Sequence, residues 1–171
     1  MNYSEMRLAA KTGDILLVEG KGFFSRLVRV VTGESISHVA LLFWLDGGLF
    51  VAEMIEGKGY QILPASQWFP AAGPVLFGCA PQVVQDLPKT ILRTIAKYRD
   101  NKKQQRYGYC SLLKVWWAQV TGKQIKVHQR VCSTFVQDVW EQCGFHFKQT
   151  ADPGDYLGLC RFISAMEPAD A

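Results

Sequence analysis

The sequence predicts an α+β fold, because its apolar pattern changes from strand-like to helix-like part-way along the chain. Between residues 13 and 79, short apolar runs alternate with glycine-containing turns, which is typical of strands. After Pro81 the apolar residues recur at helical spacing, which is typical of amphipathic helices. The chain has 171 residues, 49% hydrophobic and 20% charged, so we expect one globular domain, residues 1–171.

Five short apolar runs in the first half of the chain are expected to be strands. Asp46 and Gly47 separate two of these runs, and an Asp-Gly pair is a strong signal for a two-residue hairpin turn. Such a turn sets Leu45 opposite Gly48 in an antiparallel pair. The expected strands are residues 15–18, 37–45, 49–55, 60–63 and 75–79.

Apolar residues at helical spacing predict four helices, and the last of them begins near Cys132. Gly144 stands where this helix should end, because glycine readily adopts the left-handed conformation of a C-terminal cap. The segment from Ala151 to Asp155 carries the turn signals of a loop. The expected helices are residues 23–31, 87–97, 112–120 and 131–143.

The formal net charge is +4, and basic residues concentrate between residues 87 and 130, where Asp100 is the only acid. A basic face of this kind can attract a cell-wall polymer, phospholipid head groups or nucleic acid. No nucleic-acid motif accompanies the charge, so we favour a solvated helix face over a nucleic-acid site and expect no specific nucleic-acid partner. The basic residues are Lys89, Arg93, Lys97, Arg99, Lys102, Lys103, Arg106, Lys114, Lys123, Lys126 and Arg130.

The first residues, Met1 to Lys11, lack the apolar core of a signal peptide, and no apolar run reaches membrane-spanning length. We therefore expect a cytoplasmic protein without a transmembrane segment, and delivery elsewhere by another protein stays open. The five cysteines are an odd number without C-x-x-C spacing, which favours free thiols in a reducing compartment.

Cys132 is the candidate nucleophile because it stands at the start of the last predicted helix. The positive end of the helix dipole stabilises a thiolate there, and the unpaired amides that follow can face an oxyanion. Arg130 would lower the pKa of the thiol further. The alternative is a small buried cysteine. The other four cysteines are expected to be of this structural kind: Cys79, Cys110, Cys143 and Cys160.

The chain has three histidines, and His38 is the preferred candidate for the base. It follows Ser37 and opens an apolar strand, so its imidazole would lie at the mouth of a buried strand. His128 lies four positions before Cys132 and is the rival, whereas His146 lies beyond the far end of the helix. The histidines and cysteines lack the spacing of a zinc site, so no metal is expected.

Glu53 would complete the candidate site if the hairpin has the expected register. A two-residue turn sets Ala40 opposite Glu53, and His38 is then the diagonal neighbour of Glu53 on the same face. A carboxylate in an apolar strand usually needs a partner, and orienting an imidazole would provide one. The alternatives are a glutamate at the sheet edge that faces water, or a three-residue turn that reverses its face.

Four segments resemble, in their order along the chain, the motifs of the YiiX-like, NlpC-related permuted papain-like hydrolases. The order of histidine, glutamate and then a cysteine at a helix start is the fairly specific part of this resemblance. In unpermuted papain-like enzymes the cysteine helix comes first, so this order marks a permutation. A loop, Asp152 to Asp155, also resembles a short family segment, and the match extends from about Gly13 to Asp155. The four segments are residues 13–17, 37–41, 51–54 and 131–136.

The resemblance implies a permuted papain-like fold of the NlpC type, with a central antiparallel sheet packed against helices that include the cysteine-bearing helix. It implies Cys132 as nucleophile, His38 as base and Glu53 as the orienting residue. It further implies a tyrosine ahead of the cysteine that serves the oxyanion. Tyr107 is the best match for this tyrosine, and Tyr109 is the alternate.

The resemblance also implies a cysteine amide hydrolase that works through an acyl thioester and needs no cofactor. We expect first a peptide amide of peptidoglycan stems, in a bacterial or phage setting. A lipid acyltransferase or amidase of the lecithin retinol acyltransferase type is the alternative, and a non-catalytic binding module or a basic nucleic-acid-binding protein stays open. Four aromatic residues are candidates for lining an acyl groove: Phe23, Phe24, Trp116 and Trp117.

Overall fold

The computed structural model describes residues 1–19, 35–55, 57–101 and 131–167. Within these residues a six-stranded sheet has the strand order β4-β3-β2-β1-β5-β6, and every neighbouring pair is antiparallel. This agrees with the α+β class that the sequence predicts and with the antiparallel sheet that the resemblance implies. The strands are β1 (Ile15–Val18), β2 (His38–Leu45), β3 (Gly48–Ile55), β4 (Gly59–Pro64), β5 (Val75–Cys79) and β6 (Phe162–Ala165).

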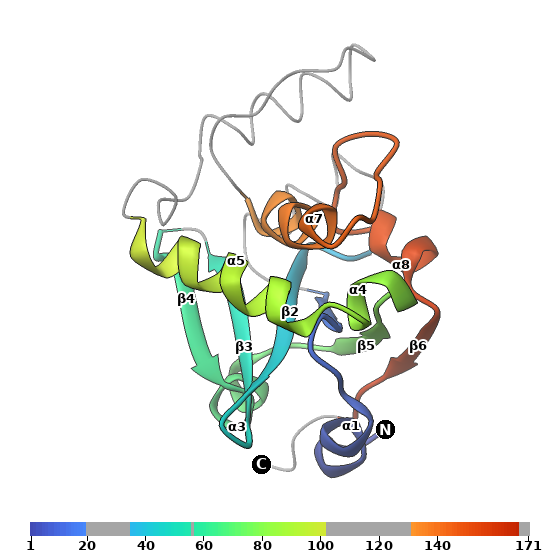
Figure 1. Ribbon diagram of the computed structural model, residues 1–171. Helices are drawn as coiled ribbons and strands as arrows, with labels where there is room; N and C mark the ends of the chain where they lie inside the picture. Colours follow the sequence, from blue (N-terminus) through green and yellow to red (C-terminus); the bar gives the residue numbers. More distant parts are fainter. Residues whose placement is uncertain (20–34, 56, 102–130, 168–171) are drawn as a thin grey trace.

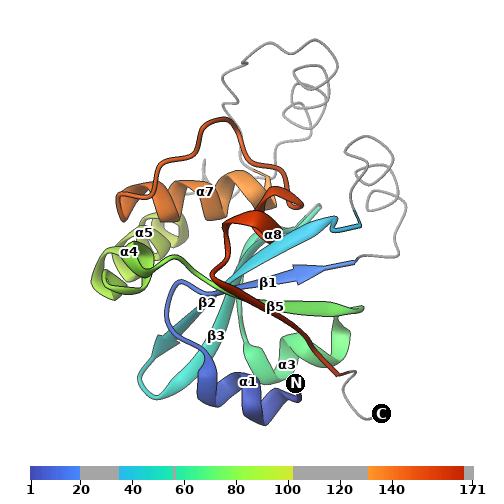
Figure 2. The ribbon, with the colours of Figure 1, turned by 90° about the vertical axis from the view of Figure 1, so that its right-hand side faces the viewer.

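Helices lie on both faces of the sheet (Figures 1 and 2). Among the described residues the two longest helices, α5 and α7, lie on one face with α4 and α8, and α1 and α3 lie on the other. The helices are α1 (Tyr3–Ala9), α3 (Ala65–Trp68), α4 (Gln82–Gln85), α5 (Pro88–Asp100), α7 (Cys132–Gln142) and α8 (Asp155–Leu159), with a 3-10 turn, η1 (Phe69–Ala71).

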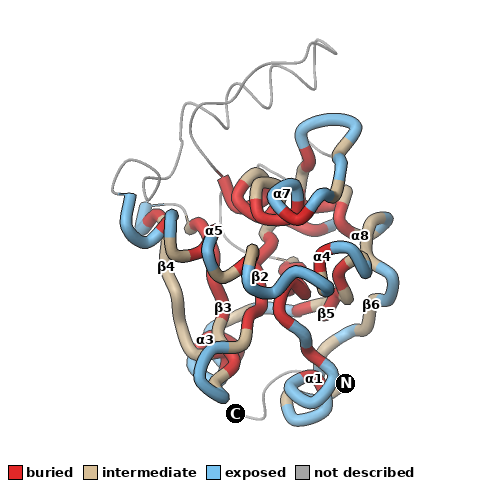
Figure 3. The backbone as a smooth tube through the Cα atoms, viewed as in Figure 1, coloured by how far each residue is buried: buried red, intermediate tan, exposed pale blue. Residues whose placement is uncertain are grey.

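The sheet separates two hydrophobic cores, because successive side chains of a strand point to opposite faces. In β1, Ile15 and Leu17 face the layer of α5 and α7, whereas Leu16 and Val18 face the layer of α1 and α3. All four side chains are buried, so β1 is covered on both faces. Figure 3 shows buried residues along α7 and through the strands beside it. The first core therefore fixes α7 against the sheet.

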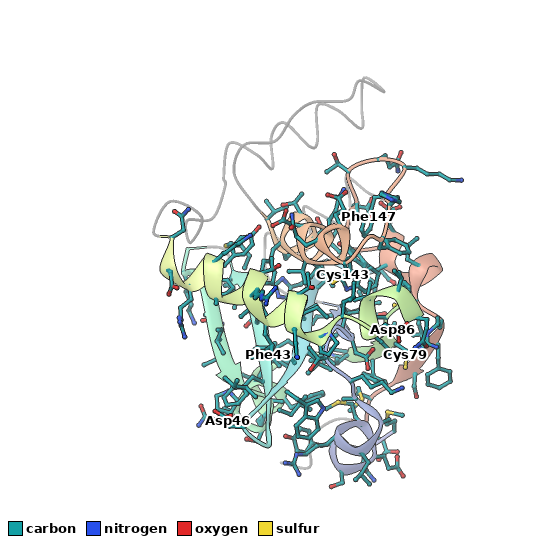
Figure 4. All side chains as sticks on the ribbon, viewed as in Figure 1. Phe43, Asp46, Cys79, Asp86, Cys143 and Phe147 are labelled. Atoms are coloured by element: carbon teal, nitrogen blue, oxygen red, sulfur yellow. The ribbon has the colours of Figure 1, made fainter. Side chains whose placement is uncertain are left out.

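The β2–β3 hairpin turns at Asp46 and Gly47, and Figure 4 shows Asp46 at its tip. Their φ angles, 48° and 77°, are both positive, as a type I′ turn requires. Leu45 pairs with Gly48, so the predicted register of this hairpin is confirmed. The same register directs the side chains of β2 and β3 that form the candidate site.

Helix α7 begins at Cys132, and its end is capped as the sequence predicts. Gly144 follows the C-cap with a φ of 85° and donates its amide to the carbonyl of Glu141. The amide of Phe145 donates to the carbonyl of Trp140, which completes a Schellman motif. The indole Nε1 of Trp140 donates to the carbonyl of Gly13 at 3.1 Å. This hydrogen bond ties α7 to the segment that enters β1.

Gly13 is expected to be sensitive to substitution because it combines a φ of 105° with close neighbours. A Cβ at this position would lie 2.8 Å from Ile91 Cδ1 and 2.9 Å from Val84 Cγ1. Gly13→Ala should lower the free energy of unfolding by about 2 kcal/mol, from backbone strain and overpacking together. Urea denaturation would measure this loss.

Gly47 provides the matched control for this prediction. Its φ is 77°, but a Cβ there would meet nothing within 4 Å. Gly47→Ala should therefore cost only the strain of the positive φ, about 1 kcal/mol. Equal losses for the two variants would contradict the steric argument at Gly13.

Some elements differ from the sequence prediction. Helix α5 continues to Asp100, beyond the expected end at residue 97. The sequence reasoning missed the edge strand β6 and four short helices, which carry only a weak apolar pattern: α1, α3, α4 and α8. The expected helices 23–31 and 112–120 lie outside the described residues. In the part of the chain that the structure describes, no helix is long and apolar enough to cross a membrane.

Candidate active site

Cys132 is the first residue of α7, and only 7% of its surface is exposed. Val131, with extended backbone at φ −110°, precedes it as the N-cap. The amide of Val131 donates to the hydroxyl oxygen of Thr134 at 2.9 Å. The same hydroxyl donates to the carbonyl of Val131 at 3.2 Å. Thr134 thus holds the first turn of the helix, which Cys132 opens.

The sulfur of Cys132 accepts hydrogen bonds from the backbone amides of Val39 and Ser133. The amide of Ser133 belongs to the first turn of α7, where backbone donors lack helical partners. The amide of Val39 is available because the paired part of the β2–β3 ladder ends at Leu41 and Ala52. The sulfur therefore lies at the end of the sheet where β2 begins, against both strand and helix.

His38 and Glu53 form a close pair next to this sulfur. Nε2 of His38 lies 2.7 Å from Oε2 of Glu53. The other ring nitrogen, Nδ1, is therefore left for the hydrogen bond between His38 and Cys132. The side chains of His38 and Glu53 are 21% and 2% exposed. The structure brings together the three residues that the sequence predicts for the site, in the order Cys132, His38, Glu53.

The second carboxylate oxygen of Glu53 has two donors that the sequence reasoning missed. Oε1 accepts from Gln61 Nε2 at 2.7 Å and from Trp68 Nε1 at 2.9 Å. Gln61 is the direct cross-strand partner of Glu53 in β4, so the register of the second hairpin could have indicated it. Trp68 comes from α3, and no sequence pattern indicated its approach.

The charges of these groups stabilise one another. Burial by itself would lower the pKa of His38, but the charge and hydrogen bond of Cys132, and then those of Glu53, raise it to about 10. Burial opposes ionisation of Cys132 as well, yet His38 and the two backbone amides hold the pKa of its thiol below the ordinary value. Burial would also raise the pKa of Glu53, but His38, Gln61 and Trp68 keep it below its usual range. The arrangement favours a thiolate and an imidazolium.

In the remaining described cysteines the pKa of the thiol is raised, not lowered. Burial raises the pKa of the thiols of Cys79 and Cys143, and it raises that of Cys160 to about 12. The structure therefore distinguishes Cys132 from these three thiols by its ionisation. Cys110 lies outside the described residues.

This difference predicts selective alkylation of Cys132. At about pH 6, iodoacetamide should modify Cys132 faster than the other three described cysteines, because the thiolate is the reactive form. The rate should fall at lower pH, as the Cys132–His38 pair takes up a proton. Peptide mass spectrometry against pH measures the alkylation, and equal rates for all four thiols would contradict this prediction.

Catalytic turnover should also fall at alkaline pH, as His38 loses its proton near its pKa of about 10.

Tyr156 supports the start of α7 from below. Its buried hydroxyl donates to the carbonyl of Ser133 at 2.7 Å. The loop from Asp152 to Asp155 places Tyr156 there. In this loop the Asp152 carboxylate accepts hydrogen bonds from the amides of Gly154 and Asp155 at 2.8 and 3.0 Å. The segment from Asp152 to Asp155, expected to be a loop, thus leads directly into α8 and positions a tyrosine near the candidate nucleophile.

Several predicted residues lie outside the described part of the chain. Tyr107 and its alternate Tyr109, predicted for the oxyanion, belong to this group, and so do the rival base His128 and Arg130. The assignment of an oxyanion tyrosine therefore stays a prediction. The four aromatic residues considered for an acyl groove also lie there: Phe23, Phe24, Trp116 and Trp117.

The fold of this chain is similar to that of a protein of known structure. No protein-family model and no curated protein matches the chain. Among solved structures, it matches the crystal structure of the metalloprotein yiiX from Escherichia coli O157:H7, with a TM-score of 0.59 and 18% identity. The match covers 79% of this chain and 67% of that one. The chain has a YiiX-like fold.

The YiiX-like fold agrees with one part of the resemblance seen in the sequence, and at 18% identity the likeness concerns the fold alone. The description of yiiX as a metalloprotein belongs to that protein. In residues 1–19, 35–55, 57–101 and 131–167 of this chain, no group of three or more His, Cys, Asp or Glu side chains is arranged to hold a metal ion.

Proposed function

We propose that this chain is a cysteine amide hydrolase of the permuted papain-like, NlpC-related kind, which acts through an acyl thioester. The observation that supports this most is the unbroken series Cys132, His38, Glu53 at the start of α7, with a 2.7 Å contact between the last two. A nucleophile, a base within hydrogen-bond reach and a third group that orients the base form the arrangement that thiol hydrolases need.

In the proposed reaction, the Cys132 sulfur attacks the carbonyl carbon of an amide and forms a carbon–sulfur bond. The oxyanion that results lies at the N-terminus of α7, where backbone amides and the helix dipole stabilise negative charge. As the carbon–nitrogen bond breaks, His38 gives its proton to the leaving amine, which leaves an acyl thioester on Cys132.

Water then completes the cycle. His38, now neutral, takes a proton from the water as its oxygen attacks the thioester carbonyl. The carbon–sulfur bond breaks, the carboxylic acid leaves, and the thiolate–imidazolium pair forms again. Glu53 holds the ring in position throughout and stabilises its positive form, as the carboxylate does in other triads.

For the substrate class we propose amides of peptidoglycan stem peptides. The resemblance to NlpC-related hydrolases supports this class, and so does the charge of α5. Lys89, Arg93 and Lys97 recur every four positions along the exposed side of this helix. Such a basic stripe suits an anionic cell-wall polymer.

Incubating the protein with purified peptidoglycan and, in parallel, with a panel of acyl lipids would test this proposal. Mass spectrometry should detect stem-peptide fragments in the first reaction, and rapid quenching should trap an acyl adduct on Cys132. Release of fatty acyl products instead would favour the lipid acyltransferase or amidase. No product and no adduct from either panel would favour the non-catalytic binding module.

A further inference from the structure

The candidate site contains a buried carboxylate whose two oxygens have separate partners. Oε2 of Glu53 contacts His38 from β2, whereas Oε1 accepts hydrogen bonds from Gln61 of β4 and Trp68 of α3. These three are the groups that face Glu53 in the described residues, and the side chain is only 2% exposed. A carboxylate buried this deeply takes up a proton or turns toward another donor unless its oxygens are occupied.

We propose that Trp68 and Gln61 are positioning residues for the Cys132–His38 pair. By occupying Oε1 they fix the plane of the Glu53 carboxylate, so that Oε2 stays directed at Nε2 of His38. The proposal deepens the proposed function, because it assigns to two residues outside the triad the task of holding its third member.

Gln61 and Trp68 reach Oε1 of Glu53 from different parts of the fold. Gln61 is paired with Glu53 across the β3–β4 ladder, so the sheet register itself delivers its amide. Trp68 is 6% exposed and lies in the core beneath the sheet, where its ring packs edge-on against Phe69 at 5.5 Å. Only its indole N–H reaches Glu53, so phenylalanine can keep the packing and remove the donor.

A purely structural explanation is also available, because a buried indole N–H needs an acceptor wherever it lies. Trp44 provides the matched case. Its ring is partly buried against the same core, and its Nε1 donates to the carbonyl of Ala10 at 2.8 Å and not to Glu53. Losing either indole donor should destabilise the fold, whereas only the loss at Trp68 should change the chemistry of Cys132.

The experiment measures the pH dependence of Cys132 alkylation by iodoacetamide in Trp68→Phe, Gln61→Met, Trp44→Phe and the unsubstituted protein. Loss of a donor frees the Glu53 carboxylate, which weakens the support of the His38 imidazolium and raises the pKa of the Cys132 thiol. Alkylation of Cys132 at about pH 6 should therefore slow several-fold in Trp68→Phe and in Gln61→Met. Trp44→Phe should keep the unsubstituted profile, and circular dichroism verifies folding of each variant.

Adding Glu53→Gln completes a double-mutant cycle. Because Trp68 acts through Glu53, Trp68→Phe should shift the profile no further when Glu53→Gln is already present. An equal shift in both backgrounds, or no shift in Trp68→Phe and Gln61→Met, would overturn the positioning role. If Cys132 of the unsubstituted protein reacts no faster than the other cysteines, the proposed function and the positioning role fall together. If Cys132 reacts fast in the unsubstituted protein and the variants keep the same pH profile of alkylation, the positioning role alone is overturned.

Discussion

Cys132→Ala is expected to lower amide hydrolysis by about four orders of magnitude or more, because it removes the sulfur that is proposed to form the acyl thioester. The helix should still form, since alanine is the best helix former and Thr134 still holds the first turn. The measurement is the release of products from the substrate that the digestion panel identifies, together with the thermal unfolding of the variant.

Cys143→Ala is the matched control. Cys143 is the C-cap of α7, is 2% exposed and has a thiol pKa that burial raises. Its replacement should lower stability through a small cavity and leave turnover unchanged. An active Cys132→Ala variant, or equal losses in the two variants, would remove the assignment of the nucleophile.

His38→Gln is expected to have the second-largest effect, with turnover reduced about 1,000-fold or more. Glutamine can still donate a hydrogen bond to Glu53, so the buried carboxylate keeps a partner, but it cannot exchange a proton at neutral pH. Without the imidazolium, burial dominates at Cys132 and the pKa of its thiol should rise to or above the ordinary value. Alkylation against pH and turnover would measure the two effects.

His146→Gln controls for the general loss of a histidine, because His146 lies exposed beyond the far end of α7. It should change neither the alkylation profile of Cys132 nor the rate of turnover. If His38→Gln left Cys132 as reactive as before at about pH 6, another group would have to hold the thiolate, and His38 would lose its role as base.

The parts of the site and fold that could be predicted follow from local sequence signals for turns and helix ends. The Asp46–Gly47 pair required a two-residue turn, the turn fixed the register, and the register gave His38 and Glu53 a common face. Gly144 likewise indicated the end of α7. These inferences succeeded because each depends on neighbouring residues or on a single hairpin.

The donors around the site could not be predicted in the same way. Trp68 follows Glu53 by fifteen positions and arrives from a four-residue helix that no periodicity indicates. The Val39 amide is directed to the sulfur because the β2–β3 ladder stops short of it, a feature of sheet twist and packing that residue type does not encode. Tyr156 reaches Ser133 only through the packing of α8 under α7.

The sequence by itself determined the chemical groups of this site and the pairing of two of them, since alternation along a hairpin follows from its turn. The tertiary structure alone decided that Cys132, ninety-four positions after His38, meets its imidazole, because that encounter depends on how α7 packs across the sheet. It also decided the ionisation of the thiol. Burial alone would raise the pKa of Cys132, and the groups that lower it come from separate parts of the fold.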